Sequence, residues 1–551
     1  MQYLQDLTKQ IIEKELDNID EILKLRQDLA KIYKPKKLPS IIQILLASGE
    51  NRKKLINVLK SKPNRSKLGV FPVAVMARPD PCPHGACVFC PNYIKEGVAM
   101  SYTGKEPASM RAVRNKHHPY LHIFNRLQQY LLLGTVPNKI ELIIMGGTFP
   151  AQDPEYQDDF VRLCYQAMND FSSLFISPFD YEKFIEFFEL DYNDLMNEEK
   201  FARIQKKILT SINDKSMEEV KKENENSNIK IVALVQETKP DWCKESHINK
   251  MLTHGCTRVE LGIQTLNDSV LTKTHRGHDL KDSVEATRLL KDSGYKVGYH
   301  FMLGLPGNTK DDDLKYFKEL FDNPDYKPDA VKIYPCMVFK NTPLHKMYEK
   351  GLFNPMNTKE ASSLIAEMKS LIPRYCRVMR VQRDIPTYRR EAGVDKTNLR
   401  QDIHEVMRIK GLKCQCIRCR QVKDKIIGNV KLNKMEYESS NGKEIFLSLD
   451  DEQDQLVGFL RLRIPNSSFR QEINDKTAII RELHVYGETA NFGDKTVTQH
   501  LGYGKKLVEE AERITKEFGK NKIVVISGVG VKSYYRNLGY KDDGPYVSKI
   551  F

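Results

Sequence analysis

The middle of the chain alternates short apolar runs with longer helical patterns. The runs lie at 70–77, 140–145, 229–236, 257–263, 296–303, 330–334 and 377–382. Strand and helix alternation of this kind implies a parallel sheet with crossover helices, and six or seven repeats predict an open or partial barrel. Active sites of such sheets form at the carboxyl ends of the strands. We expect four residues at that edge: Cys82, Gly146, Glu260 and Pro335.

Two terminal regions and one internal stretch depart from this alternation. Residues 1–70 predict short helices with a basic second half, a binding appendage, and the barrel then occupies 71–395. Within the barrel, 171–228 predicts a helical insertion that ends in a mobile loop at 221–228. A linker at 396–424 follows the barrel.

The last region, 425–551, predicts a separate α+β domain. Its antiparallel strands are expected at 445–449, 456–464 and 477–485, with a helix at 502–518, a strand at 522–527 and a short helix near Tyr534. No apolar run reaches the length of a bilayer span, and the N-terminus lacks a signal-peptide pattern. We therefore expect a soluble, cytoplasmic protein without a membrane partner.

The net charge of +14 is unevenly distributed along the chain. Between Lys31 and Lys67 there are eleven basic residues against one acid, and between Arg374 and Lys423 fourteen against five. Such segments attract polyanions through phosphate neutralisation and counterion release. Binding of nucleic acid is favoured over the alternative, a face that is basic only for solubility.

Three of the eleven cysteines lie close together directly after the first apolar run. Cys82, Cys87 and Cys90 can hold three irons of a [4Fe-4S] cluster and leave the fourth iron open for a substrate. Zinc is the alternative, with His84 as a further ligand. The glycines of Met145-Gly-Gly-Thr-Phe149 end the next strand, where their backbone can contact an amino group beside the cluster.

A second trio, Cys414, Cys416 and Cys419, lies in the basic linker. Its spacing predicts a structural zinc ion that joins two domains, and His404 or a water is open as the fourth ligand. The isolated cysteines are expected to be small buried apolar residues: Cys164, Cys243, Cys256, Cys336 and Cys376.

A glycine-rich turn, Gln499-His-Leu-Gly-Tyr-Gly-Lys505, opens the long helix near the C-terminus. Free backbone N–H groups and the positive end of the helix dipole would face a pyrophosphate there. Tyr534 and Tyr535 follow near the end of the chain. One of them can be a core aromatic, but two adjacent tyrosines are less readily explained in that way.

Together these motifs resemble known families. The cysteine loop with Gly146 and Gly147 looks like the radical S-adenosylmethionine (SAM) enzymes, although a C-x4-C-x2-C spacing departs from their commoner C-x3-C-x2-C. The segments 499–505 and 530–540 resemble motif A and the final motif of GNAT acetyltransferases. A partial (β/α)6-type radical SAM barrel, a zinc-binding linker and an α+β GNAT domain, in that order, resemble the catalytic subunit family of Elongator. Further strings support this: 83–87, 259–264, 275–278, 332–335, 383–386 and 481–486.

The resemblance implies a reaction on tRNA. In that family a SAM-derived 5′-deoxyadenosyl radical removes hydrogen from the methyl group of acetyl-CoA. The carbon radical adds to carbon 5 of the wobble uridine in the anticodon stem-loop, and thioester hydrolysis leaves a carboxymethyl group. Elongator-type partner subunits or a homodimer are implied as well.

The resemblance also assigns roles to residues. It implies that the cluster is held by Cys82, Cys87 and Cys90, and that SAM is bound by Gly146, Gly147, Glu260 and Gln264. The residues implied for acetyl-CoA are Lys139, Glu482, Leu483, His484, Val485, Gln499, Gly502, Tyr503 and Gly504, with Tyr535 and Tyr534 acting at the thioester. The residues implied for the flipped base are Arg276, Tyr334 and Arg383.

Two other classes of function compete with this interpretation. A protein lysine acetyltransferase with a structural iron-sulfur domain would use only the last third of the chain. Such an enzyme needs an acidic cleft and a carboxylate base, whereas this chain is basic, with tyrosines at the relevant end. A non-enzymatic tRNA-binding subunit is disfavoured by the complete cysteine trio and the intact glycine turn.

Overall fold

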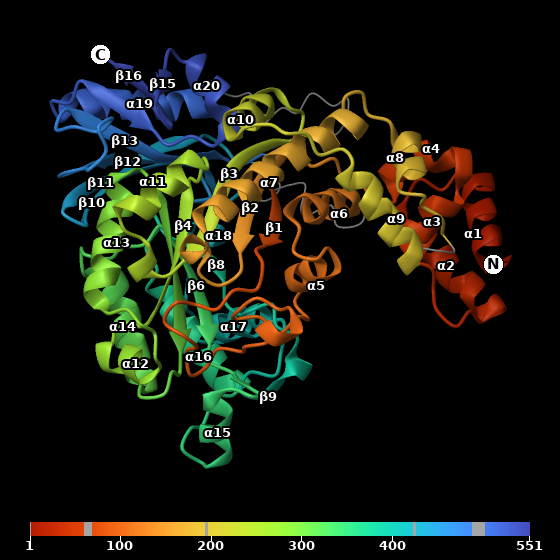
Figure 1. Cartoon of the computed structure of the whole chain (residues 1–551), viewed down its shortest axis with the longest axis horizontal. Helices are drawn as coiled ribbons and strands as arrows, with labels where there is room; N and C mark the ends of the chain where they lie inside the picture. Colours follow the sequence, from red (N-terminus) through yellow and green to blue (C-terminus); the bar gives the residue numbers. More distant parts are fainter. Residues whose placement is uncertain (1, 60–68, 193–196, 423–425, 488–501) are drawn as a thin grey trace.

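The computed structural model describes residues 2–59, 69–192, 197–422, 426–487 and 502–551. Figure 1 shows three parts: a helical unit at the N-terminus, a curled sheet with its helices in the middle, and an α+β domain that contains the C-terminus. Within the described ranges, no helix combines the length and the apolar character needed to cross a bilayer.

The central part is a seven-stranded parallel sheet whose strands follow one another in chain order. The strands are β1 (Phe71–Met76), β2 (Lys139–Met145), β3 (Lys230–Thr238), β4 (Arg258–Gln264), β5 (Lys296–Leu303), β6 (Ala330–Pro335) and β8 (Arg377–Arg380). Each apolar run of the sequence became one strand, because strands covered on one face by helices and curled around the other keep little contact with water. The predicted partial barrel is confirmed.

Helices lie along the outside of this sheet. They are α5 (Pro107–Arg114), α6 (Pro119–Leu132), α7 (Pro154–Phe175), α11 (Glu245–Thr253), α12 (Asp268–Lys273), α13 (Leu280–Asp292), α14 (Lys310–Asp322) and α16 (Thr358–Ser370), while α15 (Pro343–Glu349) projects below the sheet in Figure 1. β7 (Val338–Phe339) and β9 (Arg390–Ala392), which are far apart in the chain, pair as a small antiparallel sheet, and α17 (Leu399–Ile409) and α18 (Ile417–Arg420) form the linker.

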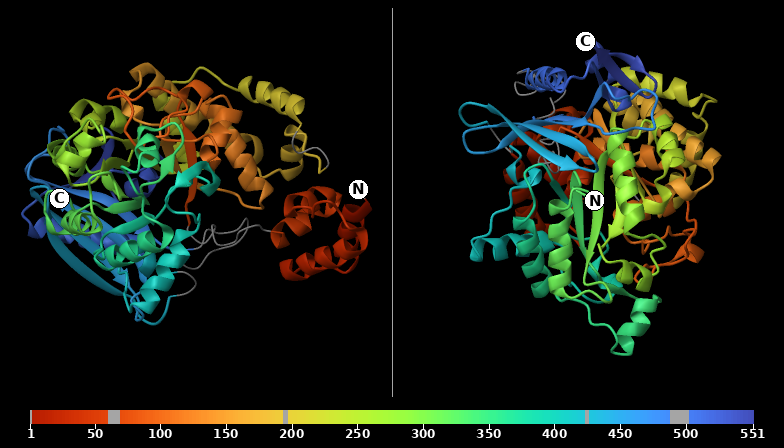
Figure 2. Two further views of the ribbon diagram at one scale, coloured as in Figure 1. Left: turned by 90° about the horizontal axis from the view of Figure 1, so that it is seen from below. Right: turned by 90° about the vertical axis from the view of Figure 1, so that its left-hand side faces the viewer.

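The N-terminal unit contains α1 (Gln2–Glu13), α2 (Ile19–Tyr33), α3 (Ile41–Ala47) and α4 (Arg52–Val58). Asn18 begins α2 by accepting a hydrogen bond from Asp20 N at 2.8 Å, which separates α2 from α1. Figure 2 shows this unit set apart from the barrel. It contacts the insertion instead: Arg52 pairs with Glu182 at 3.1 Å.

The insertion adds α8 (Tyr181–Phe187), α9 (Glu198–Leu209) and α10 (Met217–Asn226). The prediction of a mobile loop at 221–228 is wrong, because α10 covers most of it. A capping box at Ser216 starts this helix, and Val220 and Asn224 are fully buried. Glu225 of α10 pairs with Arg536 of the C-terminal domain at 2.5 Å. The insertion thus bridges the two ends of the molecule.

The C-terminal domain is a second seven-stranded sheet in the order β10-β11-β12-β13-β14-β16-β15. Its elements are β10 (Lys431–Ser439), β11 (Gly442–Asp450), β12 (Leu456–Ile464), β13 (Thr477–Val485), α19 (Tyr503–Glu517), β14 (Lys522–Val525), α20 (Lys532–Arg536), β15 (Lys541–Asp543) and β16 (Tyr546–Ile550). β13 pairs with β14 in parallel only as far as Ile480, so within the described ranges no strand pairs with the end of β13 on that side.

This domain covers the amino ends of the barrel strands through a seam of buried charges. Arg481 of β13 holds Asp329, just before β6, with two bonds of 2.7 and 2.8 Å. Arg463 of β12 holds Asp292 at 2.7 Å. Gly528 lies so close to β3 that a Cβ there would stand 2.0 Å from the carbonyl oxygen of Val232. The two domains therefore form one continuous structure.

Candidate active site

The cysteine loop follows β1 and curls at the carboxyl edge of the sheet. Cys87 and Cys90 are buried and Cys82 is partly exposed. Gly85, at φ +85°, makes the tight turn between Cys82 and Cys87, with its N–H on the Cys82 carbonyl at 2.9 Å. The loop thus presents its three thiols toward one end of a cavity.

The three sulfur atoms of this loop are spread apart. In the described chain, the groups of three candidate ligand atoms that lie within 4.8 Å of one another do not include the sulfurs of Cys82, Cys87 and Cys90. A tetrahedral zinc ion with Zn–S bonds of about 2.3 Å would require closer sulfurs, whereas a [4Fe-4S] cluster binds each thiolate at a different iron. The residues present fit the cluster, and this geometry disfavours the zinc alternative with His84.

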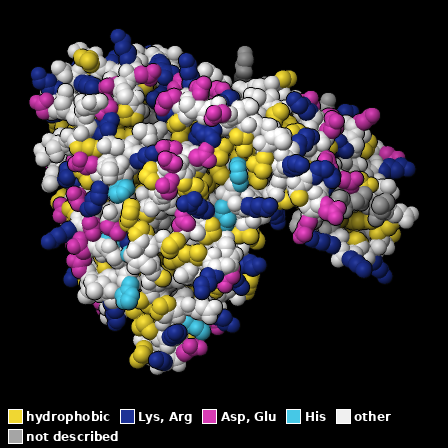
Figure 3. Space-filling model, viewed as in Figure 1, with side chains coloured by type: hydrophobic (Ala, Val, Ile, Leu, Met, Phe, Trp, Pro, Cys, Tyr) yellow, Lys and Arg dark blue, Asp and Glu magenta, His cyan; other side chains and the backbone are white. Residues whose placement is uncertain are grey.

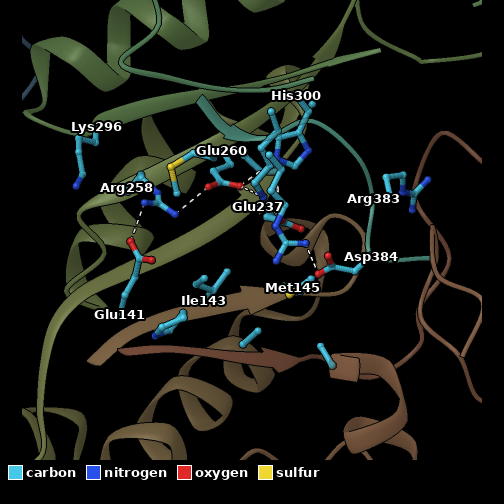
Figure 4. A pocket seen from close by; sticks show the side chains of 18 of the residues that line it. Glu141, Ile143, Met145, Glu237, Arg258, Glu260, Lys296, His300, Arg383 and Asp384 are labelled. Carbon is cyan, nitrogen blue, oxygen red and sulfur yellow. Dashed lines mark hydrogen bonds and ion pairs between the residues drawn. The ribbon is translucent and has the colours of Figure 1, made fainter. Parts of the chain in front are cut away.

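A single cavity of about 650 Å³ extends from the cysteine loop to β13 of the C-terminal domain. Its wall includes Cys82 at one end, Glu260 in the interior and His484 at the other. Figure 4 shows the interior, where side chains of β2, β3, β4 and β5 point toward one another. The cavity therefore runs along the inside of the barrel from the carboxyl edge to the amino edge of the strands.

The two glycines after β2 have different surroundings. Gly147 lines the cavity, and a Cβ there would lie 3.7 Å from Cys82 Sγ. Gly146, at φ +122°, turns back on β1, where a Cβ would stand 3.2 Å from Ala77 N. Gln264, at the end of β4, adopts φ +68° and has a buried Oε1 without a hydrogen-bond partner. Gly147 and Gln264 thus leave room and an unsatisfied acceptor beside the cysteines.

Glu260 lies in the middle of β4, so the expectation that it sits at the carboxyl edge is wrong. Burial opposes its ionisation, but Lys332 and Arg258 hold the pKa of Glu260 well below its usual range. It pairs with Arg258 at 2.9 Å and His300 at 3.0 Å, and it contacts Lys332 more closely. Lys332 also pairs with Glu237 at 2.8 Å.

Sequence analysis missed this interior network apart from Glu260. A signal was available, because Glu237, His300 and Lys332 are polar residues inside otherwise apolar strands. Such positions point into the barrel, where an isolated charge would be costly. Burial and the neighbouring Lys332 lower the pKa of His300, whose Nε2 lies 3.0 Å from a Glu260 carboxylate oxygen.

The residues predicted to clamp a base are engaged with the protein. The Arg276 guanidinium donates to Cys87 Sγ at 3.3 Å and to the Gly262 carbonyl at 2.6 Å. Arg383 donates to the carbonyl of Ser101 in the cysteine loop. Tyr334 is 8% exposed and lines the cavity, edge-on to His300. Tyr334 is the one aromatic side chain of the three, and it lies in the cavity wall.

At the other end of the cavity lie Glu482, Leu483, His484 and Val485 of β13, together with Lys139. Glu482 pairs with Lys296 at 2.8 Å and Arg461 at 2.9 Å, which overcome burial and lower the pKa of Glu482 to about 2. Burial lowers the pKa of His484 to about 4 and also lowers that of Lys139. The Glu482 side chain thus belongs to the seam between the domains.

The glycine turn and the tyrosine pair meet in the C-terminal domain. Gly502 caps α19 at φ +73°, Tyr503 begins the helix, and a Cβ on Gly504 would lie 2.7 Å from the Tyr534 hydroxyl. Tyr534 is 37% exposed, whereas Tyr535 is 5% exposed and packs in the domain core against Tyr540. Gln499 lies outside the described residues. The structure brings Tyr534, rather than Tyr535, to the glycine turn.

The second cysteine trio differs from the first. The sulfurs of Cys414, Cys416 and Cys419 lie within 4.8 Å of one another, as ligands of one metal ion would. His404 is not part of this group, and its Nε2 faces Lys369 Nζ at 3.4 Å. The trio lies between β8 and β12: Ile417 N–H bonds to Cys376 and Val422 N–H to Leu456.

Comparisons with known proteins place this arrangement in a family. A family model of the radical SAM superfamily matches residues 80–320, and one of the radical SAM C-terminal domain matches 328–408. The tRNA uridine(34) acetyltransferase of Methanocaldococcus jannaschii is 45% identical over 93% of this chain and 90% of its own. Elongator complex protein 3 of Bos taurus is 37% identical over 99% of this chain and 96% of its own. The chain belongs to the Elongator complex protein 3 family.

Membership of the Elongator complex protein 3 family is supported by structure as well. The N-terminally truncated archaeal Elp3 of Methanocaldococcus infernus has a TM-score of 0.71 and 42% identity, over 88% of this chain and 100% of its own. The family resemblance read from the sequence is confirmed. Because the family contains a radical SAM domain, SAM and a [4Fe-4S] cluster are its implied cofactors.

Proposed function

We propose that this protein attaches a carboxymethyl group to carbon 5 of the wobble uridine of tRNA, with acetyl-CoA as carbon donor and SAM as the radical source. The names of its relatives support tRNA uridine as the acceptor. The observation that carries the proposal is the continuous cavity, because it joins the cysteine trio to β13 through the barrel. Two cofactor regions that share one cavity can act on one acetyl group.

Cys82, Cys87 and Cys90 would hold the cluster, and Gly147 with Gln264 would contact SAM beside it. When bound, this pair of cofactors supplies a 5′-deoxyadenosyl radical, which can remove hydrogen from a methyl group that no protein base could deprotonate in water. The buried Oε1 of Gln264 offers a hydrogen-bond acceptor at this end of the cavity. Gly146 would keep the turn close to β1.

The opposite end of the cavity suits an anionic thioester donor. Lys139, Lys296 and Arg377 begin β2, β5 and β8 and line the cavity beside β13. The end of β13 beyond Ile480 offers backbone groups to the donor, and the turn at Gly502–Gly504 offers free N–H groups to its pyrophosphate. In this arrangement the acetyl group would enter the barrel from its amino edge.

The electrons of the proposed reaction balance. With the cluster held by Cys82, Cys87 and Cys90, one electron would be supplied to SAM, and the products would be methionine and 5′-deoxyadenosine that carries a hydrogen of the acetyl methyl. The acetyl carbon would bond to carbon 5 of uracil, and the ring would be restored when one electron returns to the oxidised cluster and the carbon 5 proton passes to water. Water then cleaves the thioester to release CoA.

Tyr534 is the better placed of the two tyrosines for thioester hydrolysis. Its hydroxyl lies beside Gly504 and it is partly open to solvent, whereas Tyr535 is buried in the domain core against Tyr540. We expect Tyr534→Phe to lower acetyl-CoA hydrolysis by about 10²-fold, the usual worth of a general acid. Tyr535→Phe is the matched control and should stay within about threefold of wild type; the reverse order would contradict the assignment.

Recognition of the tRNA body is assigned to the basic segments 31–67 and 374–423. Figure 3 shows Lys and Arg dispersed among Asp and Glu on the face in view, so no single patch there marks the whole contact. Phosphate contacts would make the affinity fall steeply with salt. Within the cavity, Tyr334 offers a ring on which the extruded uracil can stack.

The proposal is tested by anaerobic reconstitution with iron and sulfide. The protein is then incubated with reductant, SAM, acetyl-CoA and tRNA, and the tRNA nucleosides are analysed by mass spectrometry. Carboxymethyluridine that requires both SAM and acetyl-CoA supports it. Acetylated lysine on basic peptides, with no modified uridine, would support a protein acetyltransferase and contradict the proposal.

A further inference from the structure

The three cluster cysteines have unequal surroundings. Cys87 Sγ lies 3.3 Å from Nη1 of Arg276 and 3.2 Å from Nε2 of His84. In the described chain, the hydrogen bonds found at the other two sulfurs involve hydroxyl groups or a carbonyl. These are Thr148 at 3.8 Å from Cys82, and Ser101 at 3.2 Å and the Pro91 carbonyl at 3.6 Å from Cys90. One corner of the cluster site therefore receives a charged donor that the other two lack.

The position of Arg276 is fixed by the fold rather than by the cluster. Its backbone N–H bonds to the Leu271 carbonyl at 3.0 Å, and its Nη2 donates to the Gly262 carbonyl at 2.6 Å. The side chain is 7% exposed. A guanidinium held at both ends in this way points at Cys87 whether or not a ligand is present.

His84 is held against the same segment from the other side. Gly277, at φ +70°, lies under the imidazole, and a Cβ there would stand 2.6 Å from His84 Cβ. The backbone of the cysteine loop joins this segment as well, because Val88 N–H bonds to the Thr274 carbonyl at 3.1 Å. Residues 274–277 thus form a support that places two nitrogen donors on one sulfur.

We propose that Arg276 and His84 raise the reduction potential of the cluster by hydrogen bonding to the Cys87 thiolate. The reduced cluster carries one more negative charge than the oxidised one, so donors at its sulfurs stabilise the reduced form more. A guanidinium donor adds a charge-assisted bond, which is stronger than a bond from a neutral group. A higher potential makes the cluster easier to reduce and lowers the driving force for passing that electron on to SAM, so these donors set the balance between the two steps.

This inference rests on the proposed cluster ligation by Cys82, Cys87 and Cys90, and not on the identity of the acceptor. It gives Arg276 a positioning and tuning role in place of contact with RNA. The two roles differ in what they change: tuning alters the potential of the isolated holoenzyme, whereas an RNA contact alters the affinity for tRNA.

The test is a redox titration of the reconstituted full-length protein, monitored by electron paramagnetic resonance, with iron and sulfide content measured in parallel. Arg276→Gln should keep four irons per chain, as expected for one [4Fe-4S] cluster, and lower the midpoint potential. His84→Phe should lower it less, and Arg276→Lys should fall between Arg276→Gln and wild type. Arg380→Gln is the matched control, because Arg380 lines the same cavity but pairs with Asp384, and it should keep the wild-type potential.

Unchanged potentials in Arg276→Gln and His84→Phe, with full iron content, would overturn the proposal. If Arg276→Gln retains no cluster, the potentials of Arg276→Lys and His84→Phe decide, and wild-type values in both would overturn it. Weaker tRNA binding by Arg276→Gln at a wild-type potential would assign the residue to RNA instead. Wild-type protein that binds no iron would refute the ligation itself.

Discussion

The two cysteine trios of this chain look alike in sequence and differ in space. Cys82, Cys87 and Cys90 spread their sulfurs along one end of a cavity, whereas those of Cys414, Cys416 and Cys419 lie within 4.8 Å of one another. The first arrangement suits a cluster with several metal atoms, and the second suits a single ion. The separation of the sulfurs, rather than the spacing of the cysteines along the chain, therefore distinguishes the two sites.

The largest effect is expected from the first trio. Cys87→Ser removes one thiolate from the cluster, so iron content and uridine modification should fall to background while zinc stays bound. Metal analysis and nucleoside mass spectrometry measure both. Retention of iron together with modification activity would remove the first trio from the chemistry.

The second trio should show the opposite pattern. Cys416→Ser should release zinc, retain iron, and destabilise the contact between β8 and β12 by about 5 kcal/mol, a part of what structural zinc contributes in small domains. Differential scanning calorimetry of the full chain measures the loss. Cys164→Ser, at a buried thiol distant from both trios in sequence, controls for a general effect of the substitution. A zinc-free variant as stable as wild type would contradict the structural role.

The seam of buried charges tests whether the domains are joined independently of zinc. Arg481→Met leaves Asp329 and Glu444 without their shared partner, which should cost about 3–5 kcal/mol of unfolding free energy. Chemical denaturation measures this. The exposed pair of Arg513 with Glu510 provides the control, since Arg513→Met should leave the free energy of unfolding close to that of wild type. Equal effects of the two variants would argue against a seam that holds the domains.

The smallest effect is expected from acid. The pKa of Glu482 lies at about 2, below its ordinary value of 4.5, so its ion pairs stabilise the folded state fully above pH 4.5. That contribution is lost as pH falls from 4.5 toward 2, and Asp329, whose pKa is also lowered, adds to the loss. In Glu482→Gln, the free energy of unfolding should therefore change less with pH over this range. An unchanged slope would separate Glu482 from the seam.

Much of the barrel could be predicted from sequence, because each of its strands is an apolar run between helices. The C-terminal strands β11, β12 and β13 were likewise predicted, but β10 was not, since Lys431–Ser439 has polar residues on both faces. The segment 221–228 was mistaken for a loop because its residues are polar. It is mostly helical because a capping box starts the helix and because the side chains of Val220 and Asn224 are buried.

The candidate site was predictable only in part. The cysteine loop and the glycine turns could be recognised from the sequence, because the spacing of the cysteines and of the glycines is visible within a few residues. Arg276 looked like an RNA contact, and only the fold shows its guanidinium on Cys87. Neighbouring positions such as Tyr534 and Tyr535 point to different sides of a helix, so sequence alone could not choose between them.

The central claim is that one acetyl group is attacked by the radical inside the barrel. The most direct measurement uses acetyl-CoA with a fully deuterated methyl group, together with SAM, reductant and tRNA. We expect one deuterium in the released 5′-deoxyadenosine and two in the carboxymethyl group on uridine. Unlabelled 5′-deoxyadenosine formed alongside labelled uridine would contradict the central claim.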